Sequence, residues 1–283
     1  FGGDGSAIAI DPRKDRNQVY VAYQFGEHFF MDRDKLKGPV QYGPGTPDAP
    51  MRRVTPPTPK GEKTNRFNWI SPIVIDPFVS DIVYIGSQRL HRSFDQGRTW
   101  KAISPDLTRD LPQAQNPGGG DVPFSTLKDV SASPLAFGLL YCGADDGRVT
   151  MTPDGGATWR DIPTPTPDKW VSRIVASRHE ADVVYCAQSG YRDDDWRAYL
   201  YRSTDRGRTW TSISGDLPAE TINVIREDPV DAKTLYVGTD MGVWASRDAG
   251  ATWFALAGGI PNLPVHDLAI QAREDELVVA THA

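Results

Sequence analysis

The chain has 283 residues and a formal net charge of −6, and 39% of its residues are hydrophobic and 24% charged. This composition is typical of a globular protein, and the acidic balance argues against a protein that chiefly neutralises nucleic-acid phosphates. No stretch approaches the roughly 18 apolar residues of a membrane-spanning helix. The 26 Gly and 23 Pro residues predict many turns and few long helices.

A pair of short β-branched runs, joined by a polar or Asp-Pro turn, opens the chain and then recurs. Such pairs lie at residues 7–22, 71–86, 172–187, 223–238 and, in degenerate form, 265–280, and Pro134, Tyr141 and Gly143 mark one more copy at the same offsets. Runs of this kind bounded by turn residues predict antiparallel strand pairs, here named strands A and B.

An octapeptide of the pattern [Ser/Thr]-x-Asp-x-Gly-x-Thr-Trp follows four of these pairs. Its Asp, Gly and Trp residues are Asp95, Gly97 and Trp100; Asp154, Gly156 and Trp159; Asp205, Gly207 and Trp210; and Asp248, Gly250 and Trp253. An Asp can accept hydrogen bonds from the N–H groups of its own turn. A Gly supplies a positive φ, and a Trp buries a large apolar area. The octapeptide therefore predicts a structural turn between two further strands, C and D, rather than a catalytic motif.

Four short antiparallel strands that repeat every 40–60 residues or so predict an all-β fold, a β-propeller built of four-stranded blades whose C–D turns are the octapeptides. The whole chain, 1–283, is predicted to form one such domain. The expected blades are residues 5–60, which lack the octapeptide, then 69–104, 127–163, 170–214 and 221–257, with a partial blade at 265–283. The count predicts part of a larger propeller.

The octapeptide resembles the Asp-box, or BNR repeat, of sialidases, xyloglucan-cleaving glycoside hydrolases, photosystem assembly factors and sortilin-type receptors. The chain is most similar to bacterial sortilin-like proteins labelled glycosyl hydrolases. The similarity also rests on Arg66-Phe67-Asn68-Trp69, on residues 191–201 and on Pro264-Val265-His266-Asp267-Leu268. This resemblance implies a propeller fold and a secreted or periplasmic location.

Insertions into the repeat predict which face of the propeller is functional. The spacing from a strand-B tyrosine to the next octapeptide tryptophan is longest around residues 188–198, and the spacing from that tryptophan to the next tyrosine is longest around residues 105–126. The spacing between Tyr20 and Tyr84 places further extra residues near 24–65. We expect these insertions in the B–C and D–A connections, on the face opposite the octapeptides, where insertions tend to mark a working surface. Tolerated surface loops are the alternative interpretation.

The insertion at residues 191–197 is the richest in chemistry. It combines the aromatic residues Tyr191 and Trp196, the cations Arg192 and Arg197, and the carboxylates Asp193, Asp194 and Asp195. Aromatic rings and acids together suit a sugar, and a glycosidase needs two carboxylates across the scissile bond. The catalytic candidates are therefore Asp193, Asp194 and Asp195, with a partner such as Asp106 from another loop. Arg66, Trp69 and Trp170 complete the expected binding set. A solvated hairpin with internal salt bridges remains the alternative.

Other chemistries have weaker support in the sequence. Arg66, Arg173 and Arg226 lie near innermost strands, where a sialidase would gather three arginines, but separate ion pairs explain them equally well. The five His residues show no metal-ligand spacing, so neither a metal nor a cofactor is predicted. Cys142 and Cys186 replace aliphatic residues of other repeats and are expected to be buried and unpaired.

The sequence leaves open two functions from different classes. The first is a secreted or periplasmic module that binds a protein or glycan ligand through the B–C/D–A face. The alternative is a glycoside hydrolase, either sialidase-like or xyloglucanase-like. We expect no nucleic-acid partner and no membrane insertion, and we expect association with further propeller segments or a larger complex.

Overall fold

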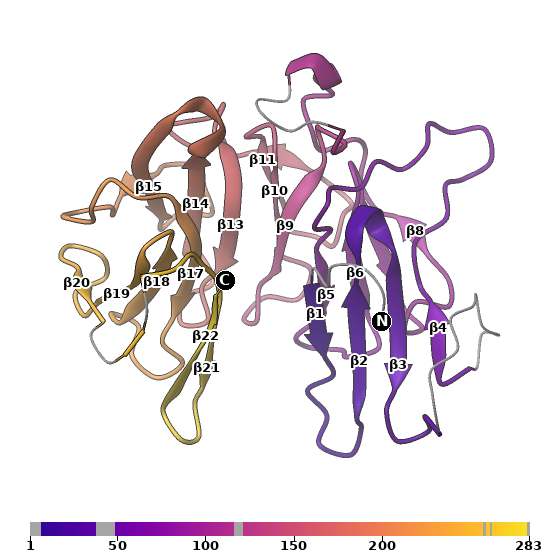
Figure 1. Cartoon of the computed structure of the whole chain (residues 1–283). Coiled ribbons are helices and arrows are strands. Elements are labelled where there is room, and N and C mark those ends of the chain that lie inside the picture. The colour runs from indigo at the N-terminus through magenta and orange to yellow at the C-terminus, as the bar shows by residue number, and fades with distance from the viewer. Residues whose placement is uncertain (1–6, 38–48, 116–120, 257–258, 261, 282–283) are drawn as a thin grey trace.

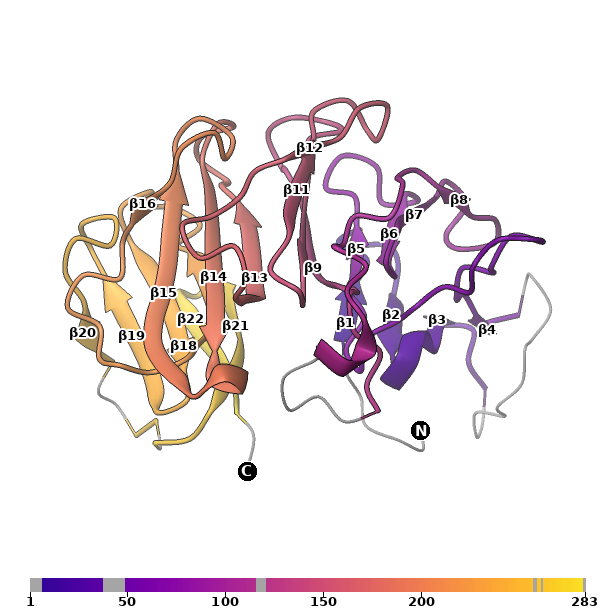
Figure 2. The same cartoon turned by 90° about the horizontal axis from the view of Figure 1, so that it is seen from above.

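Antiparallel sheets follow one another along the chain, from the indigo first sheet to the yellow last strand pair (Figures 1 and 2). This computed structural model describes residues 7–37, 49–115, 121–256, 259–260 and 262–281. Within that part of the chain, five sheets have four strands each, every strand pairs with its sequence neighbour, and one two-stranded sheet follows. The predicted all-β architecture of four-stranded antiparallel units is confirmed.

The sheets are numbered here as blades 1–5. Blade 1 contains β1 (Ala7–Ile10), β2 (Gln18–Ala22), β3 (His28–Asp32) and β4 (Met51–Arg53); blade 2 contains β5 (Ile73–Ile75), β6 (Val83–Gly86), β7 (Leu90–Ser93) and β8 (Lys101–Ala102). Blade 3 contains β9 (Leu127–Ala132), β10 (Leu140–Ala144), β11 (Val149–Thr152) and β12 (Arg160–Asp161). Blade 4 contains β13 (Trp170–Ala176), β14 (Val184–Gly190), β15 (Asp195–Ser203) and β16 (Thr211–Ser212). Blade 5 contains β17 (Ile222–Glu227), β18 (Leu235–Thr239), β19 (Gly242–Ser246) and β20 (Phe254–Ala255), and the last pair is β21 (Val265–Gln271) and β22 (Glu276–Thr281).

The hydrophobic core lies between the blades. The first strands of successive blades contact one another, and separate apolar clusters fill each junction from blades 1 and 2 to blade 5 and the last pair. The strand-B tyrosines Tyr20, Tyr84, Tyr141 and Tyr185 are almost completely buried there. Cys142 and Cys186 are also buried and unpaired, as expected. Each blade therefore depends on its neighbours for a core.

Each octapeptide forms the C–D turn of its blade and is closed by the same hydrogen bonds. In blade 3 the Gly156 N–H donates to the Thr152 hydroxyl oxygen at 2.9 Å, and Asp154 accepts bonds from the Thr158 N–H at 2.8 Å and hydroxyl at 2.6 Å. The same bonds recur in blades 2, 4 and 5. The bonds from Thr158 lower the pKa of Asp154 to about 2, so this carboxylate is charged at neutral pH.

The octapeptide glycine is required by a close interblade approach as well as by its backbone. Gly156 has a φ of +96°, and a Cβ added there would lie 2.6 Å from the Ile103 carbonyl oxygen of blade 2. Gly97, Gly207 and Gly250 face Val54, Ile162 and Ile213 of their preceding blades in the same way. The Trp159 indole also donates to the Ile103 carbonyl at 3.0 Å. The sequence predicted only the conformational role of these glycines, and the docking contact is added by the structure.

Blade 1 departs from the expected placement of the insertions. Because β3 ends at Asp32 and β4 begins at Met51, much of the extra length in residues 24–65 belongs to the C–D connection, on the octapeptide face. Residues 38–48 of that connection lie outside the described residues. In contrast, residues 188–198 extend the β14–β15 hairpin, and residues 105–126 connect β8 to β9, both as predicted. Among the described residues, no helix has the length and apolar character needed to cross a membrane.

We predict that Gly156→Ala lowers the free energy of unfolding by about 2–4 kcal/mol, because left-handed strain adds to a clash with a backbone oxygen that cannot move aside. Gly61 is the matched control, since its φ is +86° and nothing lies within 4 Å of an added Cβ. Gly61→Ala should cost only the strain of about 1–2 kcal/mol. Chemical denaturation of both variants measures the difference, and equal losses would contradict the docking role.

Candidate functional site

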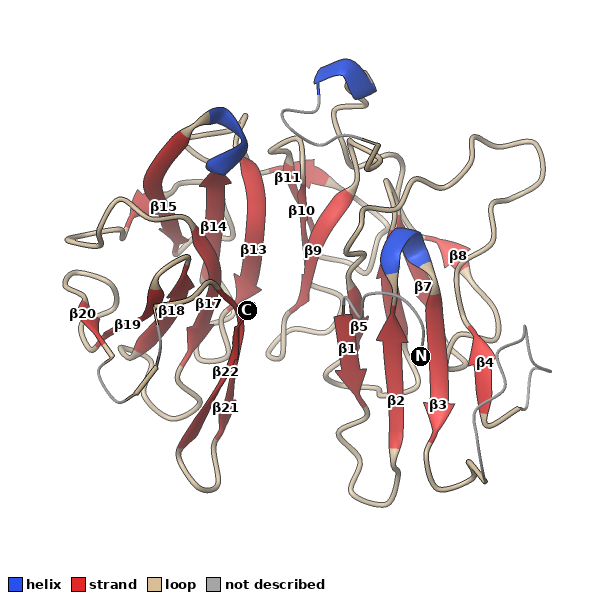
Figure 3. Ribbon diagram, viewed as in Figure 1, coloured by secondary structure: helices blue, strands red, loops and turns tan. Residues whose placement is uncertain are grey.

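In the described part of the chain, three short 3-10 helices lie on the face that carries the B–C connections. They are η1 (Gln24–Gly26), η2 (Gln113–Gln115) and η3 (Tyr191–Asp193). Figure 3 shows all three on one side of the molecule, opposite the turns that join β1 to β2 and β21 to β22. η1 and η3 join the second and third strands of blades 1 and 4, whereas η2 lies in the long connection between blades 2 and 3.

A pocket of about 210 Å³ lies between the connections that carry η2 and η3, at the junction of blades 3 and 4, and η1 does not line it. Its lining includes the carboxylates Asp145, Asp146, Asp168 and Asp193, the indole of Trp170 and the guanidinium groups of Arg109 and Arg192. Three of the sequence-predicted site residues, Trp170, Arg192 and Asp193, thus lie around one cavity. Four acids beside an aromatic ring are the kind of lining that can hold a hydroxylated ligand.

Asp145 is the most perturbed acid of the pocket. Only 2% of it is exposed, and it accepts hydrogen bonds from the Thr126 N–H at 2.8 Å, the Thr126 hydroxyl at 2.6 Å and the Asn68 amide at 2.9 Å. Burial outweighs these bonds and raises the pKa of Asp145 to about 7. The carboxyl group of Asp145 therefore changes between its protonated and charged forms near neutral pH.

Asp146 holds the neighbouring connection in place. Its two oxygens accept bonds from the Arg109 N–H at 2.7 Å and the Arg148 N–H at 3.2 Å. The Arg148 side chain in turn donates to the carbonyl of Thr108 at 2.7 Å. These contacts attach Thr108 and Arg109 to blade 3, and Arg109 forms part of one wall of the pocket.

The opposite wall comes from the lengthened β14–β15 hairpin. The Arg192 guanidinium lies over the Trp170 ring, 4.3 Å from its centroid, and Lys169 pairs with Asp193 at 2.9 Å. A cation over an indole face stabilises the pair and orients the ring. Arg192 of the hairpin therefore holds Trp170, the first residue of β13, in a defined orientation at the pocket.

Asp194 and Asp195 do not line the pocket. Asp194 ends η3 with a left-handed φ of +53°. Asp195 accepts bonds from Arg197 at 2.7 and 2.9 Å and from the Tyr199 hydroxyl, which hold the pKa of Asp195 well below its usual range. A carboxylate held in its charged form cannot donate a proton at neutral pH. This end of the hairpin has the internal salt bridge of the alternative interpretation, a solvated hairpin.

Two exposed aromatic pairs lie on the same face outside the pocket. Tyr191 and Trp196 pack edge-to-face with centroids 5.2 Å apart, and Phe25 and Trp69 do so at 5.1 Å. Tyr191 is 56% exposed and Trp196 47% exposed. Each pair offers a ring to a ligand that extends beyond the pocket.

The remaining predicted residues form ion pairs elsewhere. Arg66 contacts Asp106 at 2.9 Å and Asp110 at 3.0 Å, and neither Arg66 nor Asp106 lines the pocket. Arg173 and Arg226 share the carboxylate of Asp267, at 3.4 and 2.5 Å. The three arginines therefore belong to two separate ion-pair groups. The described residues contain no group of three or more His, Cys, Asp or Glu side chains arranged to hold a metal.

Sequence reasoning missed Asp145 and Asp146, although a signal was present. Both follow β10 directly, at the start of the B–C turn in the run Ala144-Asp145-Asp146-Gly147. Blade 5 has Thr239-Asp240-Met241-Gly242 at the equivalent place. Comparing the repeats at their B–C turns, rather than searching only the insertions, would have found these acids.

Comparison with known proteins relates the chain to carbohydrate-active enzymes. The xyloglucanase Xgh74A of Acetivibrio thermocellus is 29% identical over 157 residues, which are 48% of this chain and 18% of that protein. A xyloglucanase of Hypocrea jecorina is 28% identical over 178 residues, 62% of this chain and 18% of the relative. The matches thus span less than a fifth of either relative. Comparison with models of protein families finds no match.

Solved structures show the fold. The GH74 xyloglucanase from Xanthomonas campestris has a TM-score of 0.56 at 16% identity, over 77% of this chain and 34% of that one. The Dos1 propeller has a TM-score of 0.63 at 12% identity, over 96% of this chain and 64% of that one. These similarities confirm the predicted β-propeller. At these identities the solved structures show the fold, and the sequence relatives show a similarity to parts of xyloglucanases.

We predict that Asp145 makes stability fall as pH rises from about 4 to 7. The folded protein retains a proton that the unfolded chain, with a pKa near 3.8, has already released, so the folded state is progressively penalised over this range. The contribution is up to about 4 kcal/mol. Denaturation at a series of pH values should show a flatter profile for Asp145→Asn than for Asp240→Asn, the equivalent change in blade 5. Identical profiles would contradict the assignment.

Proposed function

We propose that this chain supplies the glycan-binding face of a carbohydrate-active propeller that hydrolyses a neutral β-glucan such as xyloglucan. The observation that carries the proposal is the pocket at the junction of blades 3 and 4, where Trp170 and four carboxylates lie together. Pyranose rings can stack on an indole, and carboxylates accept hydrogen bonds from sugar hydroxyl groups. The similarity to xyloglucanases supports this choice of substrate.

The two exposed aromatic pairs suit a polymer better than a single sugar. Phe25 and Trp69 lie at η1, and Tyr191 and Trp196 lie at η3, on either side of the long connection that carries η2 (Figure 3). We propose that a glucan chain crosses this face and contacts one or both pairs while its central residue occupies the pocket.

Asp145 is the candidate proton donor of this site. A glycosidase needs one protonated carboxyl group that gives its proton to the leaving glycosidic oxygen, and a pKa near 7 keeps Asp145 partly protonated at neutral pH. The second carboxylate, which acts as nucleophile or activates water, would come from Asp146, Asp168 or Asp193.

A binding module without hydrolytic activity is the second candidate. It is favoured by the three hydrogen bonds that tie Asp145 to Thr126 and Asn68, since a carboxyl group held in this way can serve a structural purpose. We further propose a secreted or periplasmic location and association with other propeller segments. The resemblance to sortilin-like Asp-box proteins stays a prediction.

The experiment measures xyloglucan binding by calorimetry and release of reducing ends by the full-length protein. Asp145→Asn should lower kcat by at least about 100-fold, because a general acid contributes that much or more. Trp170→Ala should weaken binding about tenfold, because one ring contact is lost. Asp240→Asn, in the equivalent turn of blade 5, should change neither quantity.

Three outcomes would contradict parts of the proposal. Binding without hydrolysis would remove the enzymatic part and leave the binding module. If the wild-type protein binds no neutral glucan, or if Trp170→Ala binds as tightly as the wild-type protein, the pocket is not the glycan site.

A further inference from the structure

The hydrogen bonds around Asp145 are divided unequally between its two carboxyl oxygens. Oδ2 accepts one bond from the Thr126 hydroxyl at 2.6 Å and one from the Asn68 amide nitrogen at 2.9 Å. Oδ1 accepts a single bond from the described residues, from the Thr126 N–H at 2.8 Å. Because each carboxylate oxygen has about two acceptor positions, those of Oδ2 are filled and one position on Oδ1 remains.

Asn68 fixes the direction of the bonds at Oδ2. Its amide nitrogen can only donate, and it lies 2.9 Å from Asp145 Oδ2 and 3.1 Å from the Thr126 hydroxyl oxygen. The amide oxygen accepts from the Ile70 N–H at 3.4 Å, which sets the orientation of the amide group. Within the part of the chain that the structure describes, the Thr126 hydroxyl has Asp145 Oδ2 as its one acceptor, so it also donates to this oxygen. Two donors directed at Oδ2 disfavour a proton there.

The contact between Asn68 and Asp145 crosses a junction between blades. Asn68 lies in the connection before blade 2 and is only 2% exposed, whereas Asp145 lies at the B–C turn of blade 3. Blade 5 has a similar pair, in which the Asn223 amide donates to Asp240 at 2.9 Å, but both of its members belong to one blade and are half-buried. The pair in blade 5 is therefore a matched control for an amide bond that does not reach the pocket.

The charges around Asp145 determine how a lost hydrogen bond would affect it. Burial raises the pKa of Asp145 and the neighbouring Asp146 raises it further, whereas the bonds from Thr126 and Asn68 lower it by stabilising the charged form. The other charged groups around it are Lys128 of β9 and, at the pocket, Arg109, Asp168, Arg192 and Asp193. Loss of one donor at Oδ2 leaves these groups in place, so it should raise the pKa of Asp145 by about one unit.

We propose that Asn68 is a positioning residue of the candidate site, which confines the exchangeable proton of Asp145 to Oδ1. No described residue accepts a hydrogen bond from Oδ1, so a proton on that oxygen stays available to a ligand. Asn68 acts only through Asp145 and Thr126. The inference rests on the proposed function, in which Asp145 gives this proton to a glycosidic oxygen.

The test is an infrared difference titration of the full-length protein across pH 5 to 9. The C=O band of the protonated Asp145 is identified by its loss in Asp145→Asn. If the proton lies on Oδ1, the carbonyl oxygen is Oδ2, and each bond that Oδ2 accepts lowers the C=O frequency. Asn68→Leu and Thr126→Val each remove one of these bonds, so both should move the band to higher frequency and raise its titration midpoint by about one pH unit.

Two control variants should leave the band and the midpoint unchanged. Thr126→Ser keeps the hydroxyl donor, and Asn223→Leu removes the corresponding amide bond in blade 5. Thermal unfolding verifies the fold of each variant, and Thr126→Val decides the question alone if Asn68→Leu does not fold. In xyloglucan hydrolysis, the alkaline limb of kcat should move with the midpoint while KM stays unchanged.

The inference and the proposed function fail in different ways. A band that stays in place in the folded Asn68→Leu and Thr126→Val proteins would put the proton on Oδ2 and overturn the positioning role. The same change in Asn223→Leu would also overturn it. If the band moves as expected but the wild-type protein hydrolyses no xyloglucan, the enzymatic part of the proposed function fails and the positioning of the proton stands.

Discussion

The contact between each octapeptide turn and the blade before it is the constraint on which the rest of the structure depends. The aspartate closes the turn, and the absence of a side chain at the glycine lets the turn approach the backbone of the preceding blade, as Gly156 does at Ile103. Because the apolar clusters lie between the blades, a blade that lost this contact would also lose its core. The octapeptide turns of blades 2–5 thereby hold the blades together on one face, while the B–C connections on the other face are free to vary.

The candidate glycan site shows how the electrostatics of a pocket follow from that arrangement. Asp145 ends a strand of blade 3, but its hydrogen bonds come from Thr126, just before blade 3, and from Asn68, just before blade 2. Two blades must be docked before the carboxyl group is enclosed, and enclosure is what raises its pKa. The acid chemistry of the pocket is thus a property of the junction and belongs to no single blade.

The same dependence explains what the sequence could and could not predict. Periodicity reveals the strands and the octapeptide turns, because a turn such as that at residues 152–159 makes its closing hydrogen bonds within itself. Asp145 was missed because its partners lie 19 and 77 residues away. Residues 191–197 were predicted to form a site because they contain many charged side chains. In the structure, however, Arg197 lies close enough to neutralise Asp195. The sequence of a segment shows how many charged residues it has. Function depends on which of those charges remain accessible after ion pairs form in the fold.

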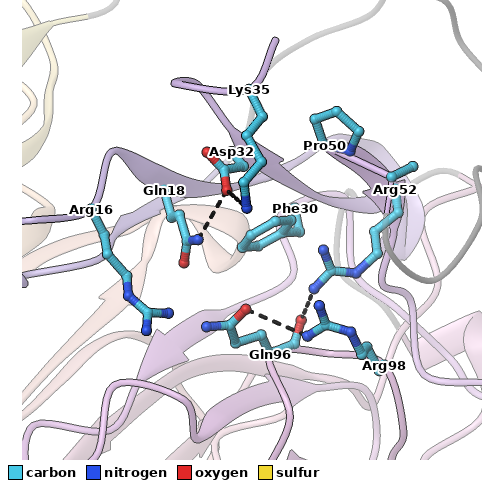
Figure 4. A pocket seen from close by; sticks show the side chains of 10 residues that line it. Arg16, Gln18, Phe30, Asp32, Lys35, Pro50, Arg52, Gln96 and Arg98 are labelled. Carbon is cyan, nitrogen blue, oxygen red and sulfur yellow. Dashed lines mark hydrogen bonds and ion pairs between the residues drawn. The ribbon is translucent and has the colours of Figure 1, made fainter.

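The repeated junction carries different side chains on its two faces. On the B–C face, acidic turn residues such as Asp145 and Asp146 follow strand B and meet an indole from the next blade. On the octapeptide face of blades 1 and 2, the carbonyl of Gln96, at a variable position of the turn, accepts a hydrogen bond from Arg52 across the interface (Figure 4). The octapeptide pattern leaves such positions unspecified, so they can vary without disturbing the aspartate and glycine that dock the blade. A turn whose repeated residues are structural can in this way make a different contact at each junction through its remaining residues.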